Sequence, residues 1–427
     1  MVFCSAGEAS GDHYGAELIS ELKRRTPGLS FFGLGGTEME AAGQRRVVRA
    51  EDVAVMGITE ILRHVPKIYL SYRRLVDSIK REEPDVAVLI DFPDVNFRLA
   101  KHCKRLGIPV IWFVSPQLWA WKRKRLRWVQ ERVRRMMVIF PFEAAFYKAR
   151  GVDAEFVGHP LASLPLPQSS REEYAAQYEL DPQKTWIALL PGSRWKEIHA
   201  NLDPMLDVAT WSAMGDDSYL EEFSGSRDRS PNSFREFGAY EFLLPVASTI
   251  DRSQLLKLID KMNRSWLDHG KVNPEDLRLH LVDDAREALH HTQASVVASG
   301  TATVQALVIG NPFVVVYRVS KTTFALAKKL IRYPAEIPAP VDEVGNLPIA
   351  MVNLIAGKRI VPELINERFT ASAVASALKP LIEDGPERET MIADLAEARG
   401  RLFASGSGTP MERVADAVLE LLGQVQR

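Results

Sequence analysis

The sequence contains little cysteine and no long apolar run, and these absences exclude several classes of protein. Its two cysteines, Cys4 and Cys103, are too few for a disulfide framework, and no CxxC metal pattern occurs. We expect both to be small core residues. No stretch of 18 apolar residues is present, which excludes a transmembrane helix. The first residues carry no basic leader and no cleavage site, so we expect a cytosolic chain. The first strand begins so early that we expect some native residues ahead of Met1.

The chain also has almost no net charge. The formal charge is −1 at pH 7, so no global attraction draws the protein to nucleic acid. Apolar residues make up 46% of the sequence and charged residues 26%, as in globular proteins. A length of 427 residues is too great for one ordinary core, so we expect two domains.

Short apolar runs alternate with helical patterns in both halves, which predicts two parallel sheets covered by helices. The runs are Met1–Cys4, Leu29–Leu34, Val86–Ile90, Val110–Val114, Met136–Phe140 and Glu155–Val157, then Trp186–Leu190, Phe242–Pro245, Leu279–Val282, Ala294–Ala298 and Pro312–Tyr317. A Pro/Ser-rich connector, 161–171, separates the halves. We therefore predict an α/β chain with two Rossmann-like doubly wound domains, 1–165 and 172–400, facing a cleft.

Two further segments complete this organisation. Residues 211–238 are rich in Ser, Asp, Arg and Gly with little periodicity, so we interpret them as a polar insertion in the second domain. Thr409, Pro410 and Glu412 form a strong helix start. We expect the helix over 409–427 to pack back on the first domain.

Small-residue turns follow strands at three places. Ser5–Asp12 follows Met1–Cys4, and Gly192-Ser193-Arg194, with Glu197 nearby, follows Trp186–Leu190. A strand, a small-residue loop and a helix together present backbone N–H groups to an anion, usually a phosphate. Arg194 suits a diphosphate. The alternative is an ordinary turn with a surface arginine.

The third turn is Ser299-Gly300-Thr301-Ala302, which precedes a helical pattern. It could receive the same diphosphate, with Gln305 one turn further on beside ribose hydroxyls. Plain N-capping by Ser or Thr is the alternative.

Asp91 and Asp94 stand at the end of the strand 86–90. A carboxylate there can accept a proton from a substrate hydroxyl. Capping of the following helix or turn is the alternative.

A basic segment, 122–135, has an apolar stripe at helical spacing made by Leu126, Val129, Val133 and Met136. Such a helix suits an anionic membrane or an acidic substrate; a solvated outer helix is the alternative. A second segment, Met56–Leu62 with residues 65–70, offers apolar side chains to acyl chains, or alternatively packs against the first domain.

Two weaker motifs are interpreted as structural rather than functional. Gly33-Leu34-Gly35-Gly36 lacks the third glycine of a dinucleotide fingerprint, since Glu38 stands there, and is interpreted as a turn. His159 is interpreted as structural.

These motifs, in order and spacing, resemble those of lipid-A-disaccharide synthases over essentially the whole chain outside the insertion. The motifs are Ser5–Asp12, Val55-Met56-Gly57, Asp91–Asn96, Val114-Ser115-Pro116 with Trp119-Ala120-Trp121, Leu190–Arg194 and Ser299–Ala302. The resemblance implies an inverting glycosyltransferase of GT-B architecture in lipid A and lipopolysaccharide biosynthesis. It joins UDP-2,3-diacylglucosamine to 2,3-diacylglucosamine 1-phosphate, giving a β-1,6 disaccharide and UDP. It further implies no metal or cofactor, a cytoplasmic enzyme peripheral on the inner membrane face, and a monomer or homodimer.

The resemblance also assigns roles. Asp91 is implied as the general base for the acceptor 6-hydroxyl. Donor-binding residues are implied at Gly192, Ser193, Arg194, Glu197, Ser299, Gly300, Thr301, Ala302 and Gln305. Acceptor-side residues are implied at Glu8, Ser10, Gly11, Asp12, Met56 and Ser115. Gln305 stands where relatives carry Glu, and its carbonyl still accepts a hydrogen bond.

Two other functions stay open from the sequence. One is a GT-B relative acting on a soluble UDP-GlcNAc-type sugar, as an epimerase or a muramyl-type transferase. The other is a membrane-associated binding protein with a decayed site, at which the glutamine at 305 hints.

Overall fold

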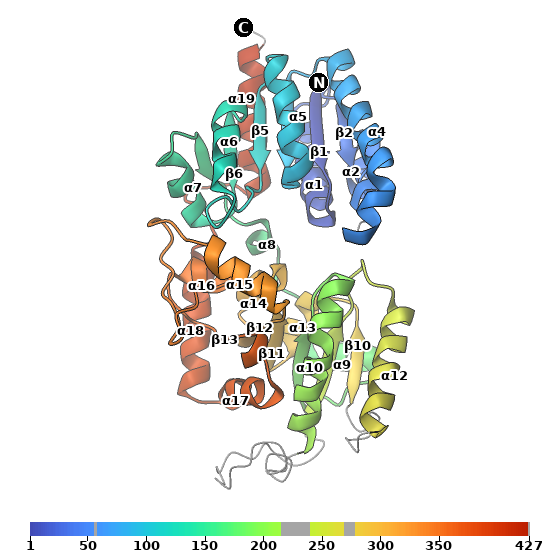
Figure 1. Cartoon of the computed structure of the whole chain (residues 1–427), viewed down its shortest axis with the longest axis vertical. Coiled ribbons are helices and arrows are strands. Elements are labelled where there is room, and N and C mark those ends of the chain that lie inside the picture. Colours follow the sequence, from blue (N-terminus) through green and yellow to red (C-terminus); the bar gives the residue numbers. More distant parts are fainter. Residues whose placement is uncertain (55–57, 215–239, 269–277, 426–427) are drawn as a thin grey trace. The chain divides into compact units, whose positions relative to one another are not determined.

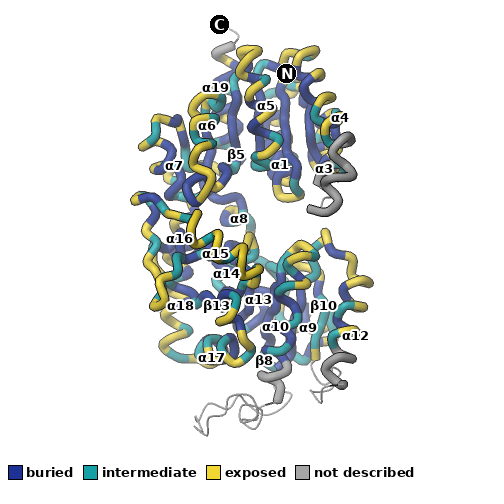
Figure 2. Tube along the Cα trace, in the orientation of Figure 1, coloured by how far each residue is buried: buried dark blue, intermediate teal, exposed yellow. Residues whose placement is uncertain are grey.

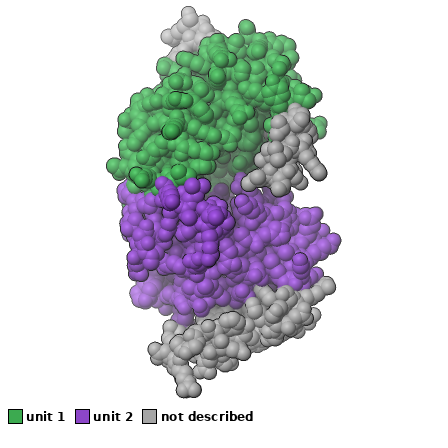
Figure 3. Space-filling model, viewed as in Figure 1, with its two compact units in different colours: residues 1–164, 330–337, 401–427 green, residues 165–329, 338–400 purple. Residues whose placement is uncertain are grey.

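The computed structural model describes residues 1–54, 58–214, 240–268 and 278–425. The side chains of residues 53–54, 58–67, 210–214, 263–268 and 424–425 lie outside this description. The chain forms two compact units (Figure 3). Unit 1 comprises Met1–Leu164, Leu330–Ile337 and Arg401–Arg427, and unit 2 comprises Pro165–Lys329 and Pro338–Gly400.

Unit 1 is built on a parallel sheet of seven strands in the order β3-β2-β1-β4-β5-β6-β7. Its central strands are continuous apolar runs buried on both faces, as expected of a parallel sheet between helical layers (Figure 2). The strands are β1 (Val2–Ala6), β2 (Phe31–Gly35), β3 (Gln44–Arg49), β4 (Val86–Ile90), β5 (Val110–Phe113), β6 (Arg135–Val138) and β7 (Ala154–Phe156).

Helices cover this sheet on both faces (Figure 1). Helix α5 packs against α4 and α6, while α1 packs against α2 and α19. The helices are α1 (Ala9–Arg25), α2 (Thr37–Ala41), α3 (Glu51–Ala54), α4 (Ile58–Glu82), α5 (Pro93–Arg105), η1 (Arg123–Arg125), α6 (Leu126–Arg132), α7 (Pro141–Lys148), α8 (Pro160–Ser163) and α19 (Pro410–Val425).

The C-terminal helix α19 lies in unit 1. Its apolar face joins the core formed by β1, β4 and α1 through Val414, Val418 and Leu421. An ion pair between Arg25 and Asp416 joins α19 to α1, and Glu420 pairs with Arg135 at 2.8 Å.

Residues 330–337 also belong to unit 1, although the chain on both sides of them belongs to unit 2. The alternation of strand and helix patterns does not predict this return. The Tyr333 ring lies 5.7 Å from the Trp119 ring. Glu336 forms an ion pair of 2.9 Å with Arg150, and the Arg332 N–H donates to the Ala120 carbonyl. The expected second domain, 172–400, included this segment. Short polar and ring contacts rather than a periodic apolar face hold it, so pattern reasoning missed it.

Unit 2 contains a parallel sheet of six strands in the order β10-β9-β8-β11-β12-β13. The strands are β8 (Thr185–Leu190), β9 (Tyr240–Pro245), β10 (Leu279–Val282), β11 (Ala294–Ala298), β12 (Phe313–Tyr317) and β13 (Glu363–Ile365). The helices are α9 (Arg171–Tyr178), α10 (Trp195–Met214), α12 (Arg252–Asp268), α13 (Ala285–His291), α14 (Thr301–Ile309), α15 (Lys321–Leu330), α16 (Met351–Ala356), η3 (Asn366–Arg368), α17 (Ala371–Ile382) and α18 (Pro386–Gly400).

Two expectations about local structure need correction. The basic segment 122–135 is not one helix, because α6 ends at Arg132 and Val133 has extended backbone angles. Met136 lies buried in β6, so the expected apolar stripe stops after Val129. In unit 2, α10 continues to Met214, so the first residues of the predicted insertion are helical. Residues 215–238 of that insertion lie outside the described residues.

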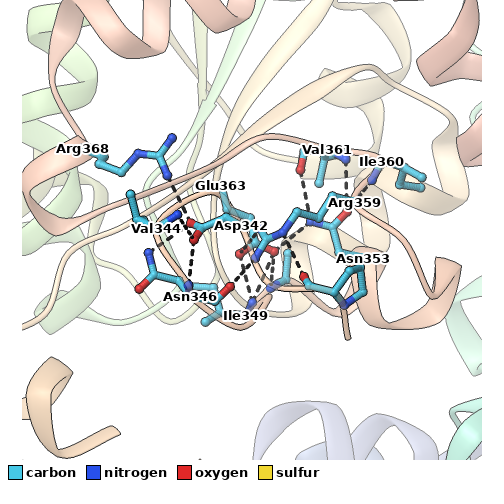
Figure 4. Close-up of polar contacts among 12 residues, drawn as sticks. Asp342, Val344, Asn346, Ile349, Asn353, Arg359, Ile360, Val361, Glu363 and Arg368 are labelled. Carbon is cyan, nitrogen blue, oxygen red and sulfur yellow. Dashed lines mark hydrogen bonds and ion pairs between the residues drawn. The ribbon is translucent and has the colours of Figure 1, made fainter. Parts of the chain in front are cut away.

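A buried polar network in unit 2 shapes the segment between α15 and β13 (Figure 4). The Glu363 carboxylate accepts hydrogen bonds from the backbone N–H groups of Ile349 and Ala350 and from Asn353 Nδ2. Asn353 is fully buried, and its Oδ1 accepts from the N–H groups of Ile360 and Val361. Asp342 accepts from Asn346 and pairs with Arg368 at 3.1 Å, which closes the turn over 342–346.

Replacing the carboxylate at the centre of this network is expected to destabilise unit 2. Glu363→Ala leaves buried N–H donors without an acceptor, for which we expect a loss of about 3 to 5 kcal/mol. The measurement is urea unfolding of both proteins. Glu367→Ala is the matched control, because that side chain is 79% exposed. Equal midpoints for wild type and Glu363→Ala would show that the network contributes nothing to stability.

Candidate functional site

The point where the strand order reverses in unit 1 lies between β1 and β4. In doubly wound sheets, ligands bind outside the carboxyl ends of the strands at this switch point. The two strands are paired in register up to Ala6 and Ile90. The motif Ser5–Asp12 spans the end of β1 and the start of α1, and Asp91 directly follows the end of β4. The structure therefore brings together two motifs that are some 80 residues apart in the sequence.

Asp91 sits in a strained turn. Its φ is 44° and that of Phe92 is 46°, so two consecutive non-glycine residues adopt the left-handed conformation. Each such residue costs roughly 1–2 kcal/mol. The Asp91 N–H donates to the Phe113 carbonyl, which extends the pairing of β4 with β5 by one residue. Phe92 occupies the N-cap position of α5 and has no polar side chain, so the helix start has no side-chain cap. Strain of this kind is typical of functional sites.

The Asn96 side chain holds this turn through hydrogen bonds. It is fully buried, and its Nδ2 donates to the carbonyl of Asp91 at 2.7 Å and to that of Ile90 at 3.2 Å. Its Oδ1 accepts from the Ser5 hydroxyl at 2.7 Å. One amide therefore ties the end of β1 to the turn that carries Asp91. The signal for this role was an isolated Asn within the apolar face of a helix, which we did not use.

Gly7 also joins the two motifs. A Cβ placed on Gly7 would lie 2.4 Å from the Phe92 ring, so no larger residue fits there without moving that ring. The loop 5–12 and the turn at Asp91 are thus packed against each other, and each limits the residues that the other can carry.

The remaining acceptor-side residues at this edge differ in their surroundings. Asp12 is buried, and its carboxylate accepts hydrogen bonds from the N–H groups of Gly36, Glu38 and Met39. It caps the start of α2 at Gly36. Gly33, Leu34 and Gly35 belong to strand β2, so the expected turn over these residues is wrong. Ser10 is exposed and Glu8 is half-buried. Their contact with substrate stays a prediction, as does that of Gly11, whose added Cβ would lie 3.3 Å from that of Ala6. Met56 lies outside the described residues.

Ser115, expected on the acceptor side, belongs to a buried cluster after β5. Its hydroxyl donates to Glu143 Oε1 at 2.7 Å, and Trp119 Nε1 donates to the same oxygen at 3.0 Å. The preceding residue, Val114, has a φ of 61°, which is rare for a β-branched side chain. Burial is the largest influence on Glu143, and it raises the pKa of this carboxyl to about 7.

This raised pKa predicts a pH-dependent stability. Between about pH 4.5 and 7 the folded state keeps the Glu143 proton while the unfolded state loses it. The free energy of unfolding therefore falls as the pH rises through this window, by at most about 3 kcal/mol. Glu143→Gln is neutral at every pH and should lose this slope. Urea unfolding of both proteins from pH 4 to pH 8 checks it, and parallel profiles would contradict the assignment.

Unit 2 repeats the switch-point arrangement between β8 and β11. These strands are paired in register up to Leu190 and Val297. Helix α10 begins shortly after one strand and α14 shortly after the other. The two small-residue turns expected to bind a diphosphate therefore lie side by side at one edge of this sheet.

The first of these turns is shaped by Glu197. Gly192 has a φ of 129°, and a Cβ there would lie 2.5 Å from that of Glu197. Glu197 Oε2 accepts from the Ser193 N–H at 3.0 Å, and its Oε1 lies 3.6 Å from Arg194 NH1. The Arg194 side chain is 67% exposed. The Glu197 carboxylate therefore accepts from a backbone N–H group of the turn that we expected to bind a diphosphate.

Two residues that sequence analysis did not single out hold this turn. The fully buried Asn201 donates through Nδ2 to the Pro191 carbonyl at 3.0 Å, and its Oδ1 accepts from the Arg318 N–H. Thr249 donates to the Ser193 carbonyl at 2.6 Å. Asn201 repeats in unit 2 what Asn96 does in unit 1: a buried amide on the helix that follows a strand anchors the turn between the two.

The second turn leads into α14 without a side-chain cap. Gly300 is the N-cap residue, so the expected alternative of Ser or Thr capping is wrong. Thr303 instead donates to the Gly300 carbonyl at 2.8 Å. Gly300 and Thr301 are exposed, while Ser299, Ala302 and Gln305 are half-buried. In the first turn of this nine-residue helix, the Thr303 N–H already donates to the Gly300 carbonyl at 3.1 Å.

The structural roles expected for Cys4, Cys103 and His159 are confirmed. Cys4 and Cys103 are buried and free, and burial raises the pKa of each thiol to about 12. His159 is buried, its Nδ1 accepts from the Leu161 N–H, and burial lowers its pKa to about 3. None of the three side chains is ionised near neutral pH or exposed to solvent, so none is suited to catalysis.

The fold of this chain resembles that of several solved structures. The chain resembles "S. aureus MnaA-UDP co-structure" with a TM-score of 0.58 at 12% identity, covering 100% of this chain and 98% of that one. It resembles the calicheamicin glycosyltransferase CalG4 with a TM-score of 0.52 at 17% identity, covering 100% and 99%. Together with the two parallel sheets, these likenesses define a chain of GT-B architecture.

The sequence of the chain narrows this class to one family. The family described as "Lipid-A-disaccharide synthetase" matches residues 2–214 and 245–403. The lipid-A-disaccharide synthase of Acidobacterium capsulatum is 46% identical over 99% of this chain and 96% of the relative, and that of Koribacter versatilis is 43% identical over 98% of each. The chain belongs to the lipid-A-disaccharide synthase family of UDP-sugar glycosyltransferases. The unmatched residues 215–244 overlap the expected insertion.

Proposed function

We propose that this chain transfers 2,3-diacylglucosamine from UDP to the 6-hydroxyl of 2,3-diacylglucosamine 1-phosphate, with inversion, to give a β-1,6 disaccharide and UDP. The observation that supports this most is the strained Asp91 at the switch point of unit 1, in a chain of this family. The adjacent starts of α10 and α14 at the switch point of unit 2 supply the matching diphosphate site.

Donor binding follows from the second arrangement. The N-termini of α10 and α14 carry partial positive charge, and Arg194 adds a full one. The diphosphate would take over the Ser193 N–H from Glu197, which frees that carboxylate for Arg194 or a ribose hydroxyl. Gln305, one turn into α14, is placed to hydrogen-bond the ribose through its carbonyl.

The reaction is then a single displacement. The acceptor O6 attacks the anomeric carbon from the face opposite the diphosphate, and the bond from that carbon to the diphosphate oxygen breaks. The electron pair leaves with UDP, while the O6 proton passes to the Asp91 carboxylate. Arg194 and the helix starts stabilise the charge that builds up on UDP. Holding both sugars in line accounts for much of the remaining rate.

The substrates also place the protein at a membrane. In the described part of the chain, no helix is long and apolar enough to cross one. Exposed apolar side chains lie instead on α4, where Tyr69 and Leu70 are 54% and 58% exposed, and at Trp121, which is 45% exposed. We place these side chains, with the basic residues 122–135, against the inner surface of the cytoplasmic membrane.

The test is a product assay with purified protein. UDP-2,3-diacylglucosamine and the acceptor monosaccharide should give the disaccharide phosphate and UDP, with inverted configuration at the anomeric carbon by NMR. Non-acylated UDP-GlcNAc should turn over far more slowly. Equal turnover of both donors would favour an enzyme of soluble sugars, and nucleotide binding without any product would favour a binding protein.

A further inference from the structure

Unit 1 contains a groove that the proposed chemistry does not use. It has a volume of about 340 Å³ and runs along α5, between α4 and α6. Figure 1 shows α5 on the outer side of the sheet. Cationic and aromatic side chains line it.

Three cations on α5 line the groove: Arg98, Lys101 and Arg105. Their spacing of three and four residues places them on one face of the helix. Within the described part of the chain, none of the three forms an ion pair. The acid that lines the groove, Asp94, is paired with Arg125 at 2.8 Å. The groove therefore carries positive charge that the described carboxylates do not neutralise.

Aromatic rings hold the walls of the groove in place. The Trp128 ring packs edge-on against Phe97, with the Arg125 and Arg132 guanidinium groups 5.5 and 5.0 Å from its centre. On the other wall, Tyr72 OH lies 2.9 Å from His102 Nε2. Burial together with Arg105, Lys80 and Lys101 lowers the pKa of His102, as expected in a field of positive charge. These contacts thus pre-organise the side chains of the groove for a ligand.

The surroundings of the groove are apolar and exposed. Tyr69 and Leu70 lie on α4 within one turn of Tyr72, and Leu106, 43% exposed, follows Arg105 at the end of α5. Exposed apolar neighbours of this kind add nothing to the binding of a soluble anion. A phosphate attached to acyl chains fits both the cations and the apolar rim.

The acceptor's own phosphate belongs elsewhere. With a rise of 1.5 Å per residue, Lys101 and Arg105 lie about 12 and 18 Å along α5 from Pro93, the second residue after Asp91. A single sugar whose 6-hydroxyl meets Asp91 does not span that distance. The far end of the groove, at Lys101 and Arg105, therefore points to a different lipid molecule.

We propose that this groove binds the phosphate headgroup of an anionic glycerophospholipid, so that the enzyme docks through a discrete headgroup site and not only through diffuse attraction. The inference deepens the membrane association proposed above and rests on it for the source of the ligand. It is independent of the roles of Asp91 and Arg194, which the product assay tests separately.

The experiment measures binding of the full chain to vesicles of phosphatidylcholine containing phosphatidylglycerol, by co-sedimentation. Lys101→Gln and Arg105→Gln each remove one groove charge, and Lys104→Gln removes one exposed charge of the same helix outside the groove. We expect a fall of about fivefold in the partition coefficient for each groove variant, and under about twofold for Lys104→Gln. All three positions are exposed, so thermal melts should coincide.

Each other result overturns the proposal in a distinguishable way. Equal losses for Lys101→Gln and Lys104→Gln would leave a membrane enzyme with only diffuse attraction. No binding of the wild type at low salt would remove both the groove and the membrane association. At constant ionic strength, inorganic phosphate in place of chloride should compete for the groove and release the wild type more than Lys101→Gln, and equal release of both would overturn the proposal.

Discussion

Asp91→Asn is expected to lower kcat by roughly 10²- to 10⁴-fold, because removal of a general base leaves the acceptor hydroxyl with no proton acceptor in line. The amide has the shape of the carboxylate, so the left-handed turn, the bond from Asn96 to the Asp91 carbonyl and the packing of Phe92 on Gly7 should all persist. The measurement is single-turnover synthesis of the disaccharide with saturating donor and acceptor.

The matched control is Asp153→Asn. This aspartate is 59% exposed and precedes β7, at the opposite edge of the same sheet from Asp91. It should retain the wild-type kcat, and UDP should bind the wild type and both variants equally. Wild-type kcat in Asp91→Asn would remove Asp91 as the base and leave proton transfer to solvent or to another residue.

Arg194→Ala is expected to lower kcat/KM for the donor by about 10²- to 10³-fold, the usual cost of removing one group that stabilises charge in a transition state. No metal is proposed, so the charge developing on UDP falls to this guanidinium and the starts of α10 and α14. The side chain is 67% exposed, and we therefore expect the thermal unfolding midpoint to stay unchanged.

Two further variants sharpen this result. Arg194→Lys should recover part of the activity, because the charge returns without the forked geometry. Lys196→Ala removes a neighbouring exposed cation of α10 and should leave kcat/KM near the wild-type value. If Lys196→Ala and Arg194→Ala reduce activity alike, the effect is one of general positive charge rather than of a specific diphosphate contact.

Asp91 shows which features of the site the sequence predicts and which it does not. The apolar run 86–90 and the carboxylate after it were sufficient to place Asp91 at the end of a buried parallel strand. Sequence did not indicate that the turn is left-handed at two residues, or that Asn96 and Gly7 hold it. These features depend on contacts with β1, and no local pattern encodes a partner so distant in the sequence.

Unit 2 gives the same division. Strand patterns predicted both β8 and β11, together with the glycine turns that follow them. Only the strand order put those turns next to each other, since β9 and β10 pair on the far side of β8. The network of Glu363 and Asn353 was missed altogether, because all its donors except Asn353 Nδ2 are backbone groups spread over 349–361.

The sequence by itself determined the alternation of strands and helices in the two α/β units, because hydrophobic periodicity and turn composition are local properties of the chain. Its motifs also resemble those of one family, to which the chain belongs. The tertiary structure decided which of those residues meet, what supports them, and that Arg98, Lys101 and Arg105 line a groove with aromatic walls. Such features arise from side chains that are distant in sequence and packed together in space, and only the folded arrangement of strands and helices specifies them.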